Sequence, residues 1–481
     1  MYDLHKIIGN SSPRGKIILT AWHSACTTNI GVNNPFLPIS YLQVMKTLSL
    51  IAAICGISIL IPFRVFCQTE ITKWPDDKRG TVSITYDDGS MNQFRYALPV
   101  MERLKLPATF YVITGSITGS KYPGKFVGRP TEQIINESAT APTNADNYFE
   151  RASAAKYLGY IGANRYYDSS AGLYEDGKDK EAYIAMDSLY AKVRNGKLKK
   201  GTELSMEMTD EQGLSWDSIK VYASKGYEFA SHTVTHAHVT VLDTTNIFYE
   251  LEKSKLDIKD HLGEKYCFTA EIPFGIEHPR AMKYSLPFYL ALRNLMTDPY
   301  MEEINRGYKT QPGLSTKEYV QWQRGPTTKT PLPLMKSWVD TVLAHGKIWL
   351  VLVFHGIDGM GYEALSHELL DIYFTYIKSH EGDLWIATFS DVAKYMRERM
   401  NATVNADQKK NSITVNLRHS LDINVYNIPL TLKTYVPKEW KNVVLNNGQS
   451  KNKLNIKKDS KGNFVLYPVT PNKRIVEIRN E

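Results

Sequence analysis

The sequence predicts an α/β protein built on a parallel sheet or barrel with a large insertion, followed by a small C-terminal β-sandwich. From residue 80 to residue 400, short apolar runs alternate with amphipathic segments of helical period. After Met400 the helical period stops, and short β-prone runs alternate with Asn, Gly, Lys and Pro turns. The 481 residues are 43% hydrophobic and 22% charged, with a mean hydropathy of −0.33. This composition is typical of a globular protein and excludes a multi-span membrane protein.

Each predicted element has a recognisable boundary or pattern. Ser215 can cap a helix that ends before Gly226, and a longer amphipathic helix stops at Gly263. Residues 348–354 are continuously apolar, as expected of a parallel strand buried on both faces. In the α/β part, strands are predicted at 81–86, 108–113, 227–230, 348–354 and 384–389, and helices at 94–104, 215–225, 243–262, 365–379 and 390–400. In the sandwich, strands are predicted at 413–417, 430–436, 463–467 and 474–478.

These patterns divide the chain into a leader at 1–67, a main domain at 68–400 and a sandwich domain at 401–481. The apolar run 48–63, behind Met45-Lys46, is short for a bilayer span and typical of a signal peptide. We expect a signal peptide at 45–67, a mis-assigned start that adds 1–44, and export to the periplasm or the medium. An uncleaved signal anchor is the alternative, and the leader would then be the contact with the membrane. Cleavage after Cys67 would leave Cys267 as the only cysteine, so no intramolecular disulfide is expected.

The basic charge lies at the two ends of the chain. The formal net charge is +8, with an excess of basic residues in 1–67 and in 401–481, so that 68–400 is mildly acidic. An acidic main domain disfavours nucleic-acid binding. The basic sandwich is either a solvated face or a contact for an anionic surface.

Three polar clusters follow predicted strands, where parallel sheets and barrels place their sites. Asp87 and Asp88 follow the first strand, His232 and His236 the third, and His355 the buried strand at 348–354. Two histidines four residues apart on one helical turn can bind one metal ion, and a carboxylate completes an open three-ligand site. His238 is expected to point away from this pair. One carboxylate and one histidine then remain as base and acid.

The motifs that contain these residues resemble those of the NodB-like polysaccharide deacetylases, carbohydrate esterase family 4. They are Thr85-Tyr86-Asp87-Asp88-Gly89, His232-Thr233-Val234-Thr235-His236, Pro273-Phe274-Gly275 and Leu352-Val353-Phe354-His355, in the family's order. The resemblance covers about 80–400. It implies an irregular (β/α) barrel of the NodB-homology type, and metal-dependent hydrolysis of N-acetyl or O-acetyl groups on sugars.

The resemblance also implies roles for individual residues. Asp88, His232 and His236 would bind the metal, most commonly Zn²⁺, with Co²⁺, Ni²⁺ or Mn²⁺ as alternatives. Asp87 would be the general base and His355 the general acid. Phe274, through its main-chain N–H, and Tyr86 would lie on the oxyanion and substrate side, and Thr233 would brace the histidine pair.

Three features depart from the family pattern. Many relatives have an arginine that holds the catalytic aspartate two residues before the proline, whereas Glu271 stands there in this chain, beside the metal ligands. Trp338 and Asp340 are only candidates for a further motif. Residues 116–210, polar and rich in tyrosine, lengthen the gap between Asp88 and His232 and are predicted to be a helical insertion. Its tyrosines either stack on sugars or pack the insertion onto the barrel, and we hypothesise that it walls the cleft.

The predicted function is therefore metal-dependent N-deacetylation of an acetylated polysaccharide or oligosaccharide. An O-acetyl esterase of the xylan type is the alternative within the hydrolases. A non-catalytic glycan-binding protein on the same fold is the alternative from another class, and Glu271 is the feature in its favour. The sandwich is expected to be a stabilising appendage rather than a sugar-binding module.

Overall fold

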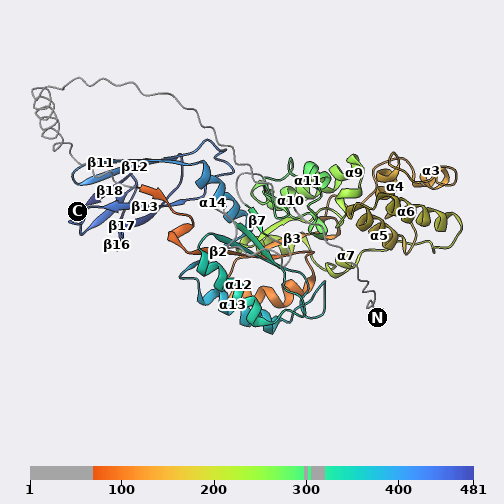
Figure 1. The fold of residues 1–481 in the computed structure, drawn as a ribbon, viewed down its shortest axis with the longest axis horizontal. Coiled ribbons are helices and arrows are strands. Elements are labelled where there is room, and N and C mark those ends of the chain that lie inside the picture. Colours follow the sequence, from red (N-terminus) through yellow and green to blue (C-terminus); the bar gives the residue numbers. More distant parts are fainter. Residues whose placement is uncertain (1–68, 297–301, 305–319) are drawn as a thin grey trace, which may run out of the picture. The chain divides into compact units, whose positions relative to one another are not determined.

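The computed structural model describes residues 69–296, 302–304 and 320–481 (Figure 1). The predicted leader, with its signal peptide and three of the four cysteines, lies outside these residues. Within them, no helix is both long enough and apolar enough to cross a bilayer.

The main domain is built around a curled sheet of nine strands whose pairings are all parallel. The strand order is β6-β5-β4-β3-β2-β9-β8-β7, and β10 pairs with the beginning of β2. The barrel is irregular, as predicted. In the described part of the chain the end strands β6 and β7 do not pair, so it is also open. The strands are β2 (Gly80–Tyr86), β3 (Thr109–Val112), β4 (Glu228–Ser231), β5 (Thr269–Ala270), β6 (Ala291–Leu292), β7 (Glu302–Ile304), β8 (Val320–Arg324), β9 (Ile348–Phe354) and β10 (Leu384–Ile386).

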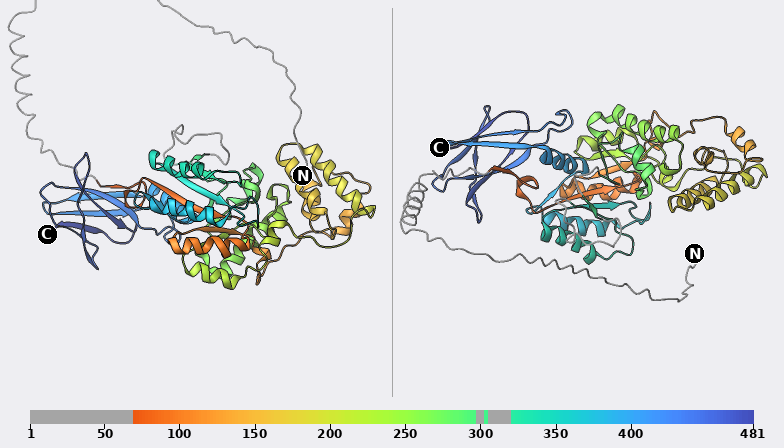
Figure 2. Two further views of the ribbon diagram at one scale, coloured as in Figure 1. Left: turned by 90° about the horizontal axis from the view of Figure 1, so that it is seen from below. Right: turned by 45° about the horizontal axis from the view of Figure 1, so that its top comes forward.

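Helices cover the outer face of this sheet, and most begin and end near the predicted residues (Figure 2). Ser215 caps its helix through a reciprocal capping box with Ser218. The helix predicted at 243–262 is a continuous helical stretch that Asp243 caps and a π-turn interrupts at Tyr249–Lys253. The main helices are α2 (Leu98–Leu104), α8 (Trp216–Ser224), α9 (Thr244–Phe248), α10 (Ser254–Leu262), α11 (Pro279–Ser285), α12 (Leu332–His345), α13 (His367–Ser379) and α14 (Phe389–Asn401).

Side chains alternate across β2, and this alternation positions the residues that follow it. Val82, Ile84 and Tyr86 pack into the core between the sheet and its helices. Thr85 points to the other face, toward the barrel interior, where its hydroxyl bonds the main-chain carbonyl of Leu352. The next residue on that interior face is Asp87.

The insertion folds as the predicted helical segment. Its helices are α3 (Thr131–Glu137), α4 (Tyr148–Ala155), α5 (Ala163–Glu175), α6 (Asp179–Arg194) and α7 (Met206–Asp210). They share a core with the chain between Ala237 and Leu292. Tyr148, Tyr167 and Tyr190 are fully buried in this core, so these tyrosines pack the insertion rather than bind sugar.

The C-terminal strands form two antiparallel sheets, one with the order β11-β12-β18-β14-β15 and one with the order β1-β13-β17-β16. The strands are β1 (Thr69–Ile71), β11 (Thr403–Gln408), β12 (Ser412–Arg418), β13 (Leu430–Val436), β14 (Val443–Asn446), β15 (Lys451–Leu454), β16 (Lys457–Lys458), β17 (Asn463–Val469) and β18 (Val476–Asn480). The predicted boundary placed residues 69–71 in the main domain. The structure instead pairs them with β13. Without them β13 would be an edge strand with unpaired N–H and C=O groups, and a nearby segment can pair with such groups.

Candidate active site

The carboxyl ends of the parallel strands surround a cleft of about 550 Å³. All the polar clusters that the sequence predicted reach it. Its lining includes Asp87, Asp88, Glu207, His232, His236, Glu271, Phe274, Arg293, Gln323, His355 and Tyr362.

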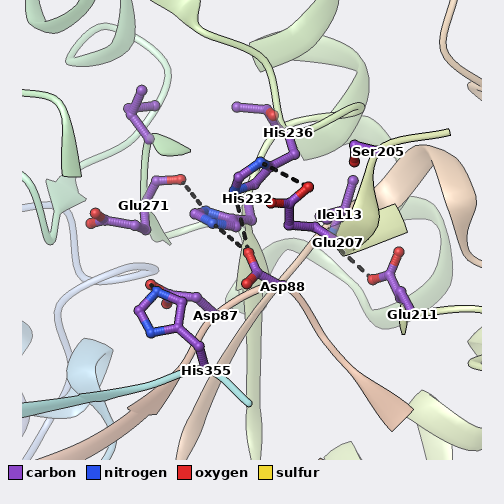
Figure 3. Close-up of polar contacts among 12 residues, drawn as sticks. Asp87, Asp88, Ile113, Ser205, Glu207, Glu211, His232, His236, Glu271 and His355 are labelled. Carbon is purple, nitrogen blue, oxygen red and sulfur yellow. Dashed lines mark hydrogen bonds and ion pairs between the residues drawn. The ribbon is translucent and has the colours of Figure 1, made fainter. Parts of the chain in front are cut away.

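Asp88, His232 and His236 form a buried group whose potential ligand atoms all lie within 4.8 Å of one another (Figure 3). We call these three residues the metal set. Asp88 Oδ1 lies 3.4 Å from His232 Nε2 and 3.2 Å from His236 Nε2. His232 Nδ1 contacts the main-chain carbonyl of Glu271 at 2.8 Å, so Nδ1 carries the hydrogen and Nε2 presents a lone pair to the group.

This donor set fits a divalent cation. Asp88 Oδ1 is buried and has no hydrogen-bond partner within the described residues, and a buried oxygen in that situation is costly unless a cation meets it. One carboxylate and two imidazoles are a three-ligand set of the kind that leaves positions open for water and substrate.

The histidine pair lies on a tight turn and not on the helical turn that its spacing predicted. Thr233 and His236 have positive φ angles of 66° and 55°, which a helix does not allow. Thr233 Oγ1 accepts the N–H of Ala237 across the turn. The buried carboxylate of Glu250, which sequence reasoning missed, accepts the N–H groups of Val234 and Thr235 and the Thr235 hydroxyl.

His238 lies outside the metal set, as its spacing predicted. Its Nδ1 lies 3.2 Å from both carboxylate oxygens of Glu175, on α5 of the insertion. Its main-chain N–H donates to the hydroxyl of Tyr167, also on α5.

Asp87 is held by an arginine that sequence reasoning missed. Arg293 follows β6 and donates from Nη1 and Nη2 to the two oxygens of Asp87 at 2.8 and 2.5 Å. Its Nη1 also donates to the Thr85 hydroxyl, and its Nε donates to Glu271 at 3.2 Å. The orientation of Asp87, which Glu271 had left unexplained, therefore comes from the neighbouring strand, with Glu271 as the second partner of the same guanidinium.

The charges around Asp87 favour its ionised form. Burial would raise its pKa, but Arg293 first, and then His355 and His232, lower it below the ordinary value. The pKa of Arg293 is raised, because attraction by Asp87 and Glu271 outweighs its burial.

His355 faces Asp87 from the end of β9. Its Nε2 lies 3.4 Å from Asp87 Oδ2, and its ring meets the exposed Tyr362 edge-on. The buried Gln93, a further residue that the sequence did not reveal, donates to the main-chain carbonyls of both Asp87 and His355 and so ties the two strand ends together.

The structure places Phe274 in the cleft and Tyr86 in the core. Phe274 has φ 64° in the tight Pro273-Phe274-Gly275 turn, which Asn294 holds by donating to the carbonyls of Ile272 and Ile276. Tyr86 is fully buried, and its ring stacks on Phe110. The alternation of β2 turns this ring toward the helices, so the side chain of Tyr86 does not line the cleft.

The candidates for a further motif lie elsewhere. Trp338 is buried in the core on α12, and Asp340 accepts a hydrogen bond from the hydroxyl of Tyr376 on α13. Neither residue lines the cleft.

The end of the insertion reaches the metal set instead. Glu207, on α7, lies 3.9 Å from His236 Nδ1 (Figure 3). Glu211 is buried and accepts hydrogen bonds from the Ile113 N–H and the Ser116 hydroxyl. Gly89 approaches Glu211 so closely that a Cβ there would lie 2.7 Å from its carboxylate, which accounts for a glycine directly after Asp88.

The sequence is similar to a protein family model and to a curated protein. Residues 75–142 match the family model described as polysaccharide deacetylase. A gellan lyase from a Bacillus species is 23% identical over 245 residues, which are 47% of this chain and 10% of that protein. The chain therefore spans about a tenth of the length of that curated relative.

Solved structures with some likeness include the Xyl-CE4 domain of a xylanase from the hindgut metagenome of Trinervitermes trinervoides, 12% identical, covering 65% of this chain and 89% of that one. Two family 4 carbohydrate esterases, PdaA from Bacillus subtilis and an enzyme from Streptomyces lividans, are 12% and 11% identical. They cover 65% and 64% of this chain and 80% and 91% of their own. The TM-scores are 0.29, 0.28 and 0.28, so the fold described above rests on the strand order of this chain itself. The match to the polysaccharide deacetylase model is limited to residues 75–142, and within this segment it agrees with the family that the motifs resemble.

Proposed function

We propose that this protein removes acetyl groups from a polysaccharide or oligosaccharide in a metal-dependent hydrolysis, with N-acetyl groups as the first candidate substrate. One observation carries the proposal. Asp88, His232 and His236 form a metal-binding set in the same cleft as a second carboxylate, Asp87, and a facing imidazole, His355. Metal-dependent hydrolysis of an acetyl group uses a cation, a general base and a general acid in one place.

The metal identity is part of the proposal. An oxygen and two nitrogen donors suit Zn²⁺, and Co²⁺, Ni²⁺ or Mn²⁺ can use the same ligands. A cation held there would supply Lewis-acid chemistry, by polarising the acetyl carbonyl and acidifying a water molecule.

The residues of the chain divide the remaining work. Asp87, kept ionised by Arg293, accepts the proton of the attacking water as general base. His355, across from Asp87, donates a proton to the departing amine or alkoxide. The main-chain N–H of Phe274, in its strained turn at the cleft wall, stabilises the developing oxyanion.

Acetate release from defined glycans tests this proposal. The panel contains chito-oligosaccharides, peptidoglycan and acetylated xylan, and acylated gellan is added because a relative is named a gellan lyase. We expect release that chelation and His232→Ala abolish and that His345→Ala, an exposed histidine on α12, leaves unchanged. Release that survives both chelation and His232→Ala would contradict the metal-dependent mechanism.

The same panel separates the alternatives. Preference for acetylated xylan over chito-oligosaccharides would make the protein an O-acetyl esterase, because the same residues serve both leaving groups. Binding of a glycan without acetate release, at full metal content, would favour a non-catalytic glycan-binding protein. We further propose export through the leader, which amino-terminal sequencing of the mature protein tests.

A further inference from the structure

A second cavity, of about 280 Å³, lies beside the metal cleft. It shares Glu207, His236 and Phe274 with the cleft, so the two spaces are neighbours. The rest of its lining comes from the insertion, chiefly from Lys156, from α5 and from the segment before α7. We call this cavity the insertion pocket. Its volume is just below the range of roughly 300–1,000 Å³ for sites of drug-sized ligands, so it has room for a group of one sugar's size.

Phe274 lines both the insertion pocket and the cleft. One face of its ring stacks on His238, with centroids 3.7 Å apart and planes 7° apart. The side chain nevertheless remains 47% exposed, which is unusual for phenylalanine at the wall of a cavity. A flat ring with one face supported, a tilted contact to His236 and exposed surface left over is a platform on which the C–H face of a sugar can stack.

The insertion fixes this platform in place. His238, which supports the ring, is buried and is held by Glu175 and Tyr167 of α5. The ring of Phe274 also leans on the predicted metal ligand His236, with centroids 4.6 Å apart. The insertion, the stacking platform and the metal set are therefore in direct contact.

The polar lining of the pocket suits an uncharged polyol. Lys156 and Arg165 bring cationic donors, while Asp168, Glu203 and Glu207 bring anionic acceptors. Lys156 Nζ donates to the carbonyl of Thr235, on the turn between His232 and His236. This bond leaves further N–H donors on the ammonium group. Sugar hydroxyls both donate and accept hydrogen bonds, so they can pair with cationic and with anionic side chains. An ionic ligand would be repelled by the side chains of its own sign.

We propose that the insertion pocket binds the neutral sugar unit next to the acetylated one, with Phe274 as the stacking platform between the two subsites. This inference rests on the proposed function, because that function places an acetylated sugar over the metal set. The insertion thereby selects for an oligomeric substrate of at least two sugars.

Calorimetric binding of sugars to the purified full chain tests the inference separately from turnover. The ligands are chitotetraose, cellotetraose and xylotetraose, each compared with its monosaccharide. We expect at least one tetrasaccharide to bind roughly tenfold or more tightly than its monosaccharide, as one or two added hydrogen bonds and a stacking contact would give. Arg165→Ala and Asp168→Ala should each remove most of that gain. Lys180→Ala and Glu181→Ala, matched charge changes on the exposed side of α6, should preserve it.

Equal affinity for tetrasaccharide and monosaccharide in every series would overturn the inference. So would an equal loss in the pocket variants and in the α6 variants. Hydrolysis of 4-nitrophenyl acetate, which needs only the metal cleft, keeps the two proposals apart. Full hydrolysis of 4-nitrophenyl acetate without pocket-dependent sugar binding would refute the subsite and keep the proposed function. Pocket-dependent sugar binding without any acetate release would refute the proposed function and keep the subsite.

Discussion

Arg293 lies between two buried carboxylates, and its removal is expected to have a large effect on stability. At the observed separations of 2.5 and 3.2 Å, each pair attracts by roughly 5–7 kcal/mol at an effective dielectric constant near 20. Desolvation offsets much of this attraction, and removing one partner of a buried pair costs about 3–5 kcal/mol. We therefore expect Arg293→Met to lower the free energy of unfolding by about 3–5 kcal/mol. The matched control Arg103→Met, which breaks an exposed pair with Asp371, should cost less than about 1 kcal/mol.

The decisive perturbation is a charge exchange between positions 271 and 293. Glu271→Arg alone would place a second guanidinium beside Arg293, and Arg293→Glu alone would leave the buried carboxylates without their cation, so each should destabilise as strongly as Arg293→Met. The double variant Glu271→Arg with Arg293→Glu again offers one guanidinium to Asp87 and one carboxylate beside it. We expect it to recover at least half of the lost stability, as a coupled pair does in a double-mutant cycle.

Urea denaturation in the presence of a chelator measures these effects without a contribution from bound metal. Arg293→Lys serves as a milder variant if Arg293→Met fails to fold. Lysine keeps the charge but loses the bidentate fork, so we expect a roughly hundredfold loss in kcat from a misplaced Asp87. If Glu271→Arg alone were as stable and as active as the parent chain, the assignment of Glu271 as the counter-ion of Arg293 would be refuted.

Three further predictions concern the metal set, the general acid and a buried acid near the sandwich. His232→Ala should abolish both acetate release and stoichiometric metal binding, measured by elemental analysis, and retained metal would exclude His232 as a ligand. His355→Ala should lower kcat by roughly 10²–10⁴-fold with unchanged metal content, and a smaller loss would exclude general-acid catalysis. Burial raises the pKa of Glu398 to about 7, despite the Ile428 N–H bond and nearby Lys394, and His419 faces its carboxylate. Because the folded-state pKa is raised, this group stabilises the fold below about pH 4.5, and that contribution is lost as the pH rises through 7. The loss is at most about 3 kcal/mol and smaller with solvent screening. Urea midpoints at pH 5 and 8 should show the loss in the parent chain and less of it in Glu398→Gln, and equal losses would contradict the assignment.

Three of the predicted residues that the structure brings to the cleft follow long, well-marked strands. Asp87 and Asp88 come after the seven residues of β2, and His355 comes after the seven residues of β9. Runs of this length carry a readable pattern, and the carboxyl ends of parallel strands meet at one edge. The alternation of β2 would also have placed Tyr86 in the core, since it lies on the face opposite Asp87.

Arg293 could not be found in the same way. It follows β6, which has two residues, and the preceding β5 also has two. Neither strand is long enough to show a period. The helical turn expected for the histidine pair failed for a different reason, because main-chain bonds from Val234 and Thr235 to the buried Glu250 fix a non-helical conformation that local spacing does not encode.

The short strands also allow an arginine at the end of either strand to reach Asp87. β5 and β6 pair in parallel with Ala270 opposite Leu292, so the residues that follow, Glu271 and Arg293, reach the barrel interior side by side. A guanidinium from either strand end can therefore contact Asp87. The site requires a positive charge beside Asp87, and position 271 or position 293 can supply it. The presence of Glu271 instead of an arginine at this position does change the net charge of the cleft, because it adds a carboxylate. Apart from histidines, the charged side chains of the described cleft lining are four carboxylates and one guanidinium. This excess of negative charge beside Asp88 would favour the binding of a divalent cation and oppose its release, so the departure at Glu271 is compatible with the proposed metal site.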